Sequence, residues 1–175
     1  MLTEQELAEF EALKQRYQKP QAILLPVLWK LQEKQGWLDD AAMEYAARLA
    51  ECTKAHVLGV VSFYTMFFEK PMGRYHIQVC TNVSCMLRGG EKIYEAVKAT
   101  LGCGNMECTS DGLFSLEEVE CMGACGGAPM MAVGETFYEQ ISSEEALGIL
   151  NHIRTSGAPP VPKPTVQLPD SPAIA

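Results

Sequence analysis

The chain has 175 residues, of which 47% are apolar and 21% charged, values typical of a globular protein that can bury a core. Its 14 Lys and Arg against 22 Asp and Glu give a net charge of −8, which repels phosphate backbones, so we expect no nucleic-acid partner. The most apolar run holds only about twelve residues where a membrane span needs about twenty, which predicts a chain without direct membrane insertion.

The N-terminus shows no sign of export. Its first residues, MLTEQELAEFEALK, are acidic and amphipathic, without a basic region, an apolar stretch or a small-residue cleavage site. We therefore expect a cytoplasmic protein. In a reducing compartment, the seven cysteines are better suited to bind metal or carry out redox chemistry than to build a disulfide framework.

Residues 1–72 predict a helical bundle. The apolar residues of a first helix recur at helical spacing. The apolar residues of a second helix form a stripe that ends at Gly36, and Pro26 within this stripe is a candidate for a kink. The expected helix starts are a capping box at Thr3 and Glu6, a first-turn proline at Pro20, and N-caps at Asp39 or Asp40 and at Thr53.

Residues 73–156 change to a mixed pattern. A strand is expected from Tyr75 to Cys80 because apolar and polar residues alternate there, and a helix is expected at 90–101. The following elements are strands at 113–120 and 129–133, a turn at Gly134, and a final helix from about Ser143. This order predicts an α/β or α+β domain.

Residues 157–175 carry six of the ten prolines. Missing amide donors and fixed φ angles disfavour a packed element, so the segment predicts a Pro-rich C-terminal arm that is extended or disordered.

Six of the seven cysteines form three close pairs. Cys52 stands alone and is expected to be a small buried apolar residue. The pairs are C-x4-C at Cys80 and Cys85, C-x4-C at Cys103 and Cys108, and C-x3-C at Cys121 and Cys125. The sequence has no C-x2-C, which disfavours a zinc ribbon and a thioredoxin dithiol.

The wide spacings favour a [2Fe–2S] cluster over a single tetrahedral zinc. Glycines at 123, 126 and 127 let the backbone approach sulfur and turn its amides toward it. No histidine stands beside a cysteine of these motifs, which disfavours a Rieske centre, and we expect the three histidines to be exposed or structural. Spacing alone leaves open which two of the three pairs hold the cluster.

The stretches QVCTNVSCMLRGG and VECMGACGGAPMM resemble the cluster site of the thioredoxin-like [2Fe–2S] ferredoxins. More narrowly, the chain is similar to the E-subunit family of NADH-quinone oxidoreductase, respiratory complex I, over about residues 5–155. QKQGWL, GVVSFYTMF and TSDGLFSLEEVECMGAC also match the family's habits, and the combined pattern C-x4-C-x35-C-x3-C is specific.

The resemblance implies that Cys80, Cys85, Cys121 and Cys125 hold the cluster and that residues 73–156 form a thioredoxin-like α/β domain. It also implies that FMN and NADH bind to a partner, the F subunit, among other peripheral-arm subunits. The chain is then one electron-carrying subunit of a proton-translocating NADH:quinone oxidoreductase, without a complete active site of its own. Cys103 and Cys108 depart from the family pattern, and we expect idle thiols in a surface loop.

Two alternatives stay open. The chain could be the equivalent diaphorase subunit of an NAD-linked hydrogenase or formate dehydrogenase, which shares the motifs. From another class, it could be a zinc-stabilised interaction module without a redox role. No G-x-G-x-x-G or P-loop is present, so no nucleotide-binding signature belongs to this chain.

Overall fold

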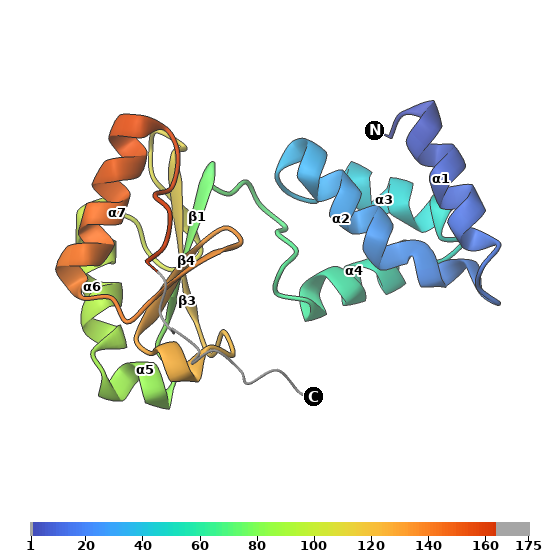
Figure 1. Ribbon diagram of the computed structural model, residues 1–175. Coiled ribbons are helices and arrows are strands. Elements are labelled where there is room, and N and C mark those ends of the chain that lie inside the picture. Colours follow the sequence, from blue (N-terminus) through green and yellow to red (C-terminus); the bar gives the residue numbers. More distant parts are fainter. Residues whose placement is uncertain (1, 164–175) are drawn as a thin grey trace, which may run out of the picture. The chain divides into compact units, whose positions relative to one another are not determined.

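The computed structural model describes residues 2–163, which divide into two compact units where Met72 meets Gly73 (Figure 1). In these residues, every helix is too short or too polar to cross a membrane.

The N-terminal unit is made of helices. They are α1 (Glu4–Lys14), the 3-10 helix η1 (Pro20–Ile23), α2 (Leu24–Gln35), α3 (Asp40–Leu49) and α4 (Lys54–Phe63). The predicted capping box at Thr3 is confirmed, and so are the N-caps at Asp39 and Thr53, whose side chains accept from backbone amides of the first turn. Pro26 is the third residue of α2, so its missing N–H falls in the first turn, where no intrahelical bond is lost.

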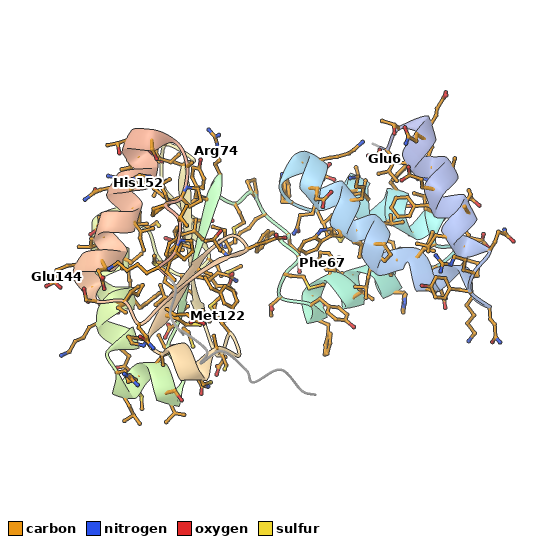
Figure 2. The ribbon with its side chains drawn as sticks, in the orientation of Figure 1. Glu6, Phe67, Arg74, Met122, Glu144 and His152 are labelled. Carbon is orange, nitrogen blue, oxygen red and sulfur yellow. The ribbon has the colours of Figure 1, made fainter. Side chains whose placement is uncertain are left out.

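The aromatic segment after α4 is fastened to α2. The Gln32 amide donates to the carbonyl of Met66 and accepts from the amide of Phe68, both at 2.7 Å. Phe67 between them is buried in the core of this unit (Figure 2).

The C-terminal unit is a five-stranded sheet with helices. The strands are β1 (Tyr75–Cys80), β2 (Glu107–Cys108), β3 (Phe114–Val119), β4 (Met130–Val133) and β5 (Thr136–Glu139). Their order is β2-β3-β1-β4-β5, with β1 and β3 parallel and the other pairs antiparallel. The helices are α5 (Val83–Leu87), α6 (Gly90–Leu101), the 3-10 helix η2 (Cys125–Gly127) and α7 (Ser143–Ser156). The α+β class is confirmed.

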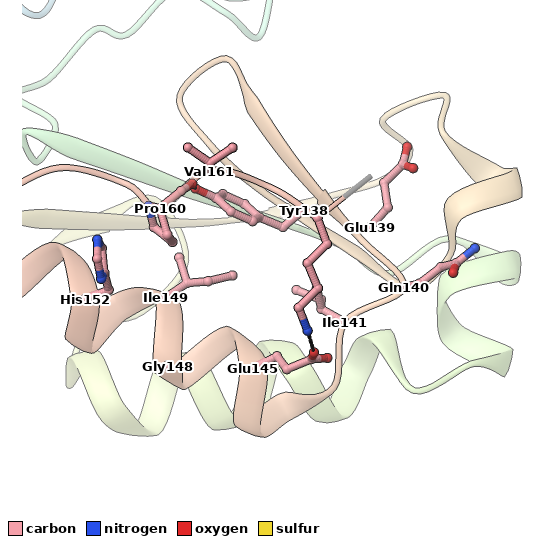
Figure 3. Close-up of a pocket in the computed structure, with 11 residues that line it drawn as sticks. Tyr138, Glu139, Gln140, Ile141, Glu145, Gly148, Ile149, His152, Pro160 and Val161 are labelled. Atoms are coloured by element: carbon pink, nitrogen blue, oxygen red, sulfur yellow. Dashed lines mark hydrogen bonds and ion pairs between the residues drawn. The ribbon is translucent and has the colours of Figure 1, made fainter. Parts of the chain in front are cut away.

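The start of the predicted C-terminal arm packs on this unit. The Tyr75 hydroxyl donates to the carbonyl of Gly157, and the Tyr138 hydroxyl donates to the carbonyl of Pro160 at 2.6 Å (Figure 3). Lys163 pairs with Glu145 of α7 at 2.5 Å. Residues 157–163 form no helix or strand, and side chains of the domain supply polar partners for this part of the arm. Residues 164–175 of the arm lie outside the described residues.

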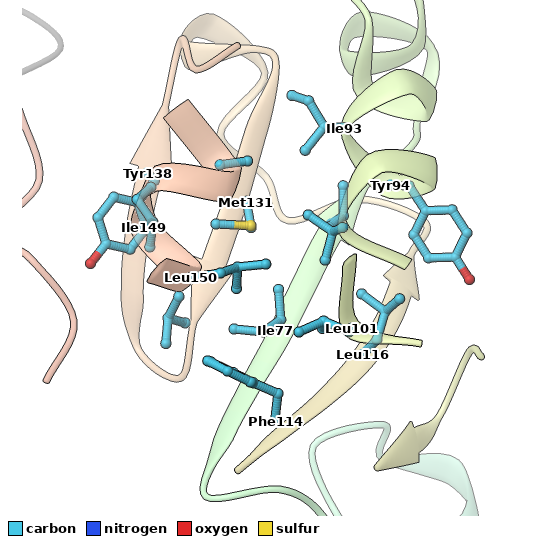
Figure 4. Packing of buried hydrophobic residues seen from close by; sticks show 14 of the residues in the cluster. Ile77, Ile93, Tyr94, Leu101, Phe114, Leu116, Met131, Tyr138, Ile149 and Leu150 are labelled. Carbon is cyan, nitrogen blue, oxygen red and sulfur yellow. The ribbon is translucent and has the colours of Figure 1, made fainter. Parts of the chain in front are cut away.

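The core of the C-terminal unit lies between one face of the sheet and the helices α6 and α7 (Figure 4). Ile77, Leu116 and Met131 reach it from three neighbouring strands and are fully buried. Because side chains alternate along a strand, the neighbours of these residues point to the opposite face. That second face carries Cys80, and it leads to the cysteine motifs.

Candidate functional site

The first cysteine pair is buried. Cys80 is the last residue of β1, and Cys85 lies in the middle of the short helix α5. Each is 2% exposed, and together with Ala128 and Met130 they form a small apolar cluster of their own. The backbone thus brings both thiols to one end of the sheet.

The second pair is exposed. Cys121 follows β3 by two residues, and Cys125 begins η2. Their sulfur atoms are 3.9 Å apart, and the amide of Gly123 donates to the Cys121 sulfur at 3.4 Å. Gly123 has a φ of +77°, a conformation that glycine adopts without strain.

The parallel pairing of β1 and β3 brings the two pairs together. Cys80 is opposite Val119 in this register, so the segments that follow both strands leave the sheet at the same end. The Cys80 thiol lies 3.9 Å from the carbonyl oxygen of Glu120, to which it donates. Met122 and Ala124, from the loop of the second pair, pack against the cluster of the first.

The sulfur separation of the second pair suits two ligands of one metal. Two thiolates on one tetrahedral metal, with bonds of about 2.3 Å, lie about 3.8 Å apart. The Cys121 and Cys125 sulfurs already have this separation. Within residues 2–163, no group of three or more His, Cys, Asp or Glu side chains gathers tightly enough to hold a single metal ion.

Burial changes the acidity of Cys85. Desolvation is the main cause that raises the pKa of Cys85 to about 11, and a hydrogen bond with Cys80 adds to it. A negative charge on Cys125 acts in the same direction. Metal binding must therefore displace a proton from Cys85.

Two glycines allow close packing around the pairs. A Cβ on Gly90, the first residue of α6, would lie 2.7 Å from the carbonyl oxygen of Cys80 and 3.0 Å from the Cβ of Cys85. A Cβ on Gly127 would lie 2.4 Å from the carboxyl carbon of Glu139. Neither contact was predicted from the sequence, although Gly127 belongs to the glycine-rich motif.

The remaining cysteines lie elsewhere. We expected Cys103 in a surface loop, but this expectation is wrong. Its side chain is buried in the core of the C-terminal unit, just after the end of α6 at Leu101. Burial raises the pKa of its thiol. Cys108 is half-buried on β2. Cys52 lies in the turn after α3 and is only partly buried against the N-terminal core. Within the described residues, none of the three forms a disulfide.

An apolar rim lies beside the first pair, and it was not predicted from the sequence. Helix α5 buries Cys85 but exposes three large apolar side chains: Val83, Met86 and Leu87. Exposed apolar groups gathered on one short helix are typical of an interaction surface.

His76 is a structural histidine, as expected for one of the three. It lies on β1 and is hydrogen-bonded to Ser115 and Glu117 of β3. The buried carboxylate that it contacts was not predicted.

Comparisons with known proteins show the family of the chain. Residues 10–154 match the family described as thioredoxin-like [2Fe-2S] ferredoxin. The chain is 40% identical over 129 residues to NADH-quinone oxidoreductase subunit 2 of Thermus thermophilus, covering 74% of this chain and 71% of that protein. It is 36% identical over 148 residues to the E 2 subunit of NADH-quinone oxidoreductase from Rhizobium meliloti, covering 85% of this chain and 88% of that one.

A solved structure shares the fold. The crystal structure of an NAD+-reducing [NiFe]-hydrogenase in the air-oxidized state gives a TM-score of 0.64 at 18% identity. The match covers 74% of this chain but only 23% of the hydrogenase chain. At 18% identity, it shows a shared fold and no more.

Proposed function

This chain belongs to the thioredoxin-like [2Fe–2S] ferredoxin family, and from that premise we propose that it is the electron-transfer subunit of an NADH:quinone oxidoreductase, respiratory complex I. Three relatives at 36–41% identity are named as subunits of NADH-quinone oxidoreductase. They favour this reading over a hydrogenase or formate dehydrogenase diaphorase and over a zinc-stabilised module.

The proposed cluster ligands are Cys80, Cys85, Cys121 and Cys125. The observation that carries the proposal is the convergence of two thiol pairs beyond the ends of two parallel strands. We assign one pair to each iron, because the 3.9 Å separation of the Cys121 and Cys125 sulfurs suits two ligands of one metal. When bound, the [2Fe–2S] cluster accepts and gives up one electron at a time.

The protein residues set the cluster's surroundings. Cys80 and Cys85 lie among apolar side chains, which keeps water from half of the site. The Gly123 amide points at the Cys121 sulfur, and such a hydrogen bond stabilises negative charge on sulfur. The exposed side, at Cys121 and Cys125, is the side on which a partner's redox group can come within electron-transfer distance.

The proposed partner is the F subunit, which would hold FMN and oxidise NADH, with other peripheral-arm subunits around it. The exposed apolar side chains of α5 lie next to Cys85 and are suited to cover the cluster edge in such a contact. The assembled complex would be cytoplasmic and peripheral to the inner membrane. This chain contributes the cluster, and the nucleotide chemistry takes place on the partner.

Metal analysis and spectroscopy test the function. Anaerobically purified chain should contain about two irons and two sulfides, and should give an electron paramagnetic resonance signal only after reduction. Alone it should oxidise no NADH. A colourless preparation with stoichiometric zinc would refute the proposal.

The docking surface has its own test. Leu87→Ser should weaken the association with the F subunit, because it removes an exposed apolar contact while leaving the buried Cys85 in place. Val161→Ser, on an exposed residue of the arm, is the matched control. If both variants associate with the F subunit equally well, α5 is not part of the interface.

A further inference from the structure

The second face of the sheet carries a polar group that the electron-transfer role does not use. His76 and Gln78 alternate with core residues on β1, and Cys80 is next on the same face. In the parallel register, His76 is opposite Ser115 and Gln78 is opposite Glu117. The polar group and the proposed ligand Cys80 therefore lie in one row.

Three hydrogen bonds of 2.8 Å connect the group. His76 Nε2 contacts Glu117 Oε2, His76 Nδ1 contacts Ser115 Oγ, and Gln78 Nε2 donates to Glu117 Oε2. The His76 and Glu117 side chains are only 11% and 12% exposed, and Ser115 is fully buried. Such a paired, partly buried arrangement is held in place by its own bonds.

The arrangement accommodates two protonation states of His76 without moving. With a neutral ring, Nε2–H donates to the Glu117 carboxylate and Nδ1 accepts from the Ser115 hydroxyl. With a protonated ring, both nitrogens donate, and the Ser115 hydroxyl turns to accept. A hydroxyl partner serves either state, which is what a proton-binding site requires.

The Glu117 carboxylate supplies the negative charge that faces the His76 ring. Burial is the largest influence on Glu117 and opposes its ionisation, but hydrogen bonds from His76 and Gln78 outweigh it and lower the pKa of the carboxyl group. By strand alternation, the other titratable or charged groups on this face, within the described residues, are Arg74 and Cys80 at the two ends of β1, Cys108 on β2 and Glu139 on β5.

We propose that the His76–Glu117 pair is a proton-binding site that takes up one proton from solvent when the cluster of this chain gains one electron. The inference rests on the proposed function. The added electron makes the cluster more negative, and the proton that His76 Nδ1 takes up restores the local charge. The electron comes from the partner's reduced flavin in the complex, or from a redox mediator in a titration. No covalent bond other than N–H forms.

His76 lies close enough to the proposed cluster for the cluster charge to change its proton affinity measurably. His76 and Cys80 are four residues apart on one strand, a distance of about 13 Å at about 3.3 Å per residue. One unit of charge at that distance, with an effective dielectric constant of about 20, changes the proton affinity roughly tenfold. Proton binding to His76 and reduction of the cluster are linked equilibria, so protonation of His76 must change the equilibrium constant for reduction by the same factor.

The test is a potentiometric titration of the full-length, cluster-loaded chain, followed by electron paramagnetic resonance from pH 5.5 to pH 9. The ratio of reduced to oxidised cluster at a fixed potential should fall roughly tenfold in total as pH rises. A ratio that stays constant across this range would overturn the proposal, whereas a chain without a cluster would instead overturn the proposed function.

Variants separate this site from other groups. His76→Gln keeps hydrogen-bonding capacity without a titrating ring, and should flatten the pH profile. Glu117→Gln should move the profile to lower pH, because the neutral amide no longer favours the protonated ring. His152→Gln, on α7 (Figure 2), is the matched control and should behave like the wild type. A full pH dependence in His76→Gln, or an unshifted profile in Glu117→Gln, would contradict the assignment.

A second measurement covers the case in which these variants lose the cluster. Nuclear magnetic resonance of histidine-labelled wild-type chain reports the titration midpoint of the His76 ring directly. The midpoint should be about one pH unit higher with the reduced cluster than with the oxidised one. Equal midpoints would overturn the proposal without any variant.

Discussion

The two proposed ligand pairs differ at the level of single residues. Cys80 and Cys85 are buried among apolar side chains, while Cys121 and Cys125 are exposed. Both pairs have similar spacing in the sequence, so the difference arises from the fold. Cys80 ends a strand of the sheet, whereas Cys121 and Cys125 lie in the segment that follows β3, with Cys125 at the start of η2.

Thiol reactivity in the cluster-free protein should follow this difference. At pH 8, iodoacetamide should modify Cys121 and Cys125 at least tenfold faster than Cys85, because a thiol of pKa about 11 holds little of the reactive thiolate. Peptide mass spectrometry over time measures the order. Equal rates would show that the first pair opens to solvent when the cluster is absent.

Substitution of single cysteines tests the ligand assignment. Cys→Ser at positions 80, 85, 121 or 125 should abolish or reshape the visible and magnetic resonance spectra, because a hard alkoxide replaces a soft thiolate poorly. The matched controls are Cys108→Ser and Cys103→Ala, which should keep the spectra. Because Cys103 is buried, its truncation should cost about 1 kcal/mol of stability, and urea unfolding measures that cost. An indispensable Cys103 would refute the assignment.

At the level of helices and strands, the sequence correctly predicted the helix starts that are determined by nearby capping side chains. The capping box at Thr3 and the N-caps at Asp39 and Thr53 follow from residues within one turn of the helix end. These signals need no tertiary contact, which is why they could be predicted.

Three short elements were missed for the opposite reason. Helix α5 has five residues and strand β2 has two, so neither shows a period. Strand β5 has four residues, and its pairing with β4 across Gly134 defines it better than its own composition does. Each of these elements depends on contacts made elsewhere in the fold, and α5 carries one of the proposed ligands.

Gly90 provides a prediction at this scale. Gly90→Ala should lower cluster occupancy and cost about 1–3 kcal/mol, because the new Cβ meets backbone atoms of both Cys80 and Cys85. Gly148→Ala is the matched control, since its Cβ in the middle of α7 meets no atom within 4 Å and should gain up to about 1 kcal/mol in helix propensity. Iron content and thermal unfolding separate the two. Full iron content in Gly90→Ala would show that the loop can shift freely.

At the level of the whole chain, spacing left open which cysteine pairs act together, and the family resemblance chose among them. The fold supplies the physical reason: β1 and β3 are parallel neighbours, so residues that follow them meet at one end of the sheet. The pairing of two strands about forty residues apart is a long-range fact that local patterns do not contain.

The C-terminal arm can be tested by truncation. A chain that ends at Gly157 should keep its cluster spectrum, because Pro160 and Lys163 bond to Tyr138 and Glu145, which are not proposed ligands. It should lose about 1–2 kcal/mol of stability, since the Tyr138 hydroxyl loses its acceptor and Ile149 loses cover. Lys163→Ala alone should change stability little, because the ion pair is exposed. An unchanged melting temperature of the truncated chain would show that the arm contributes nothing.

The separate cores of the two units affect how the chain can evolve. Every residue of one apolar cluster precedes Met72, and every residue of the other follows Gly73. A substitution that changes the packing of the N-terminal core therefore requires no second substitution in the C-terminal core. Selection can act on each core separately. Gene fusion, duplication or loss at this junction would leave a cluster-binding half intact, provided that Gly73 is kept, because any side chain there would collide with the backbone of Phe114.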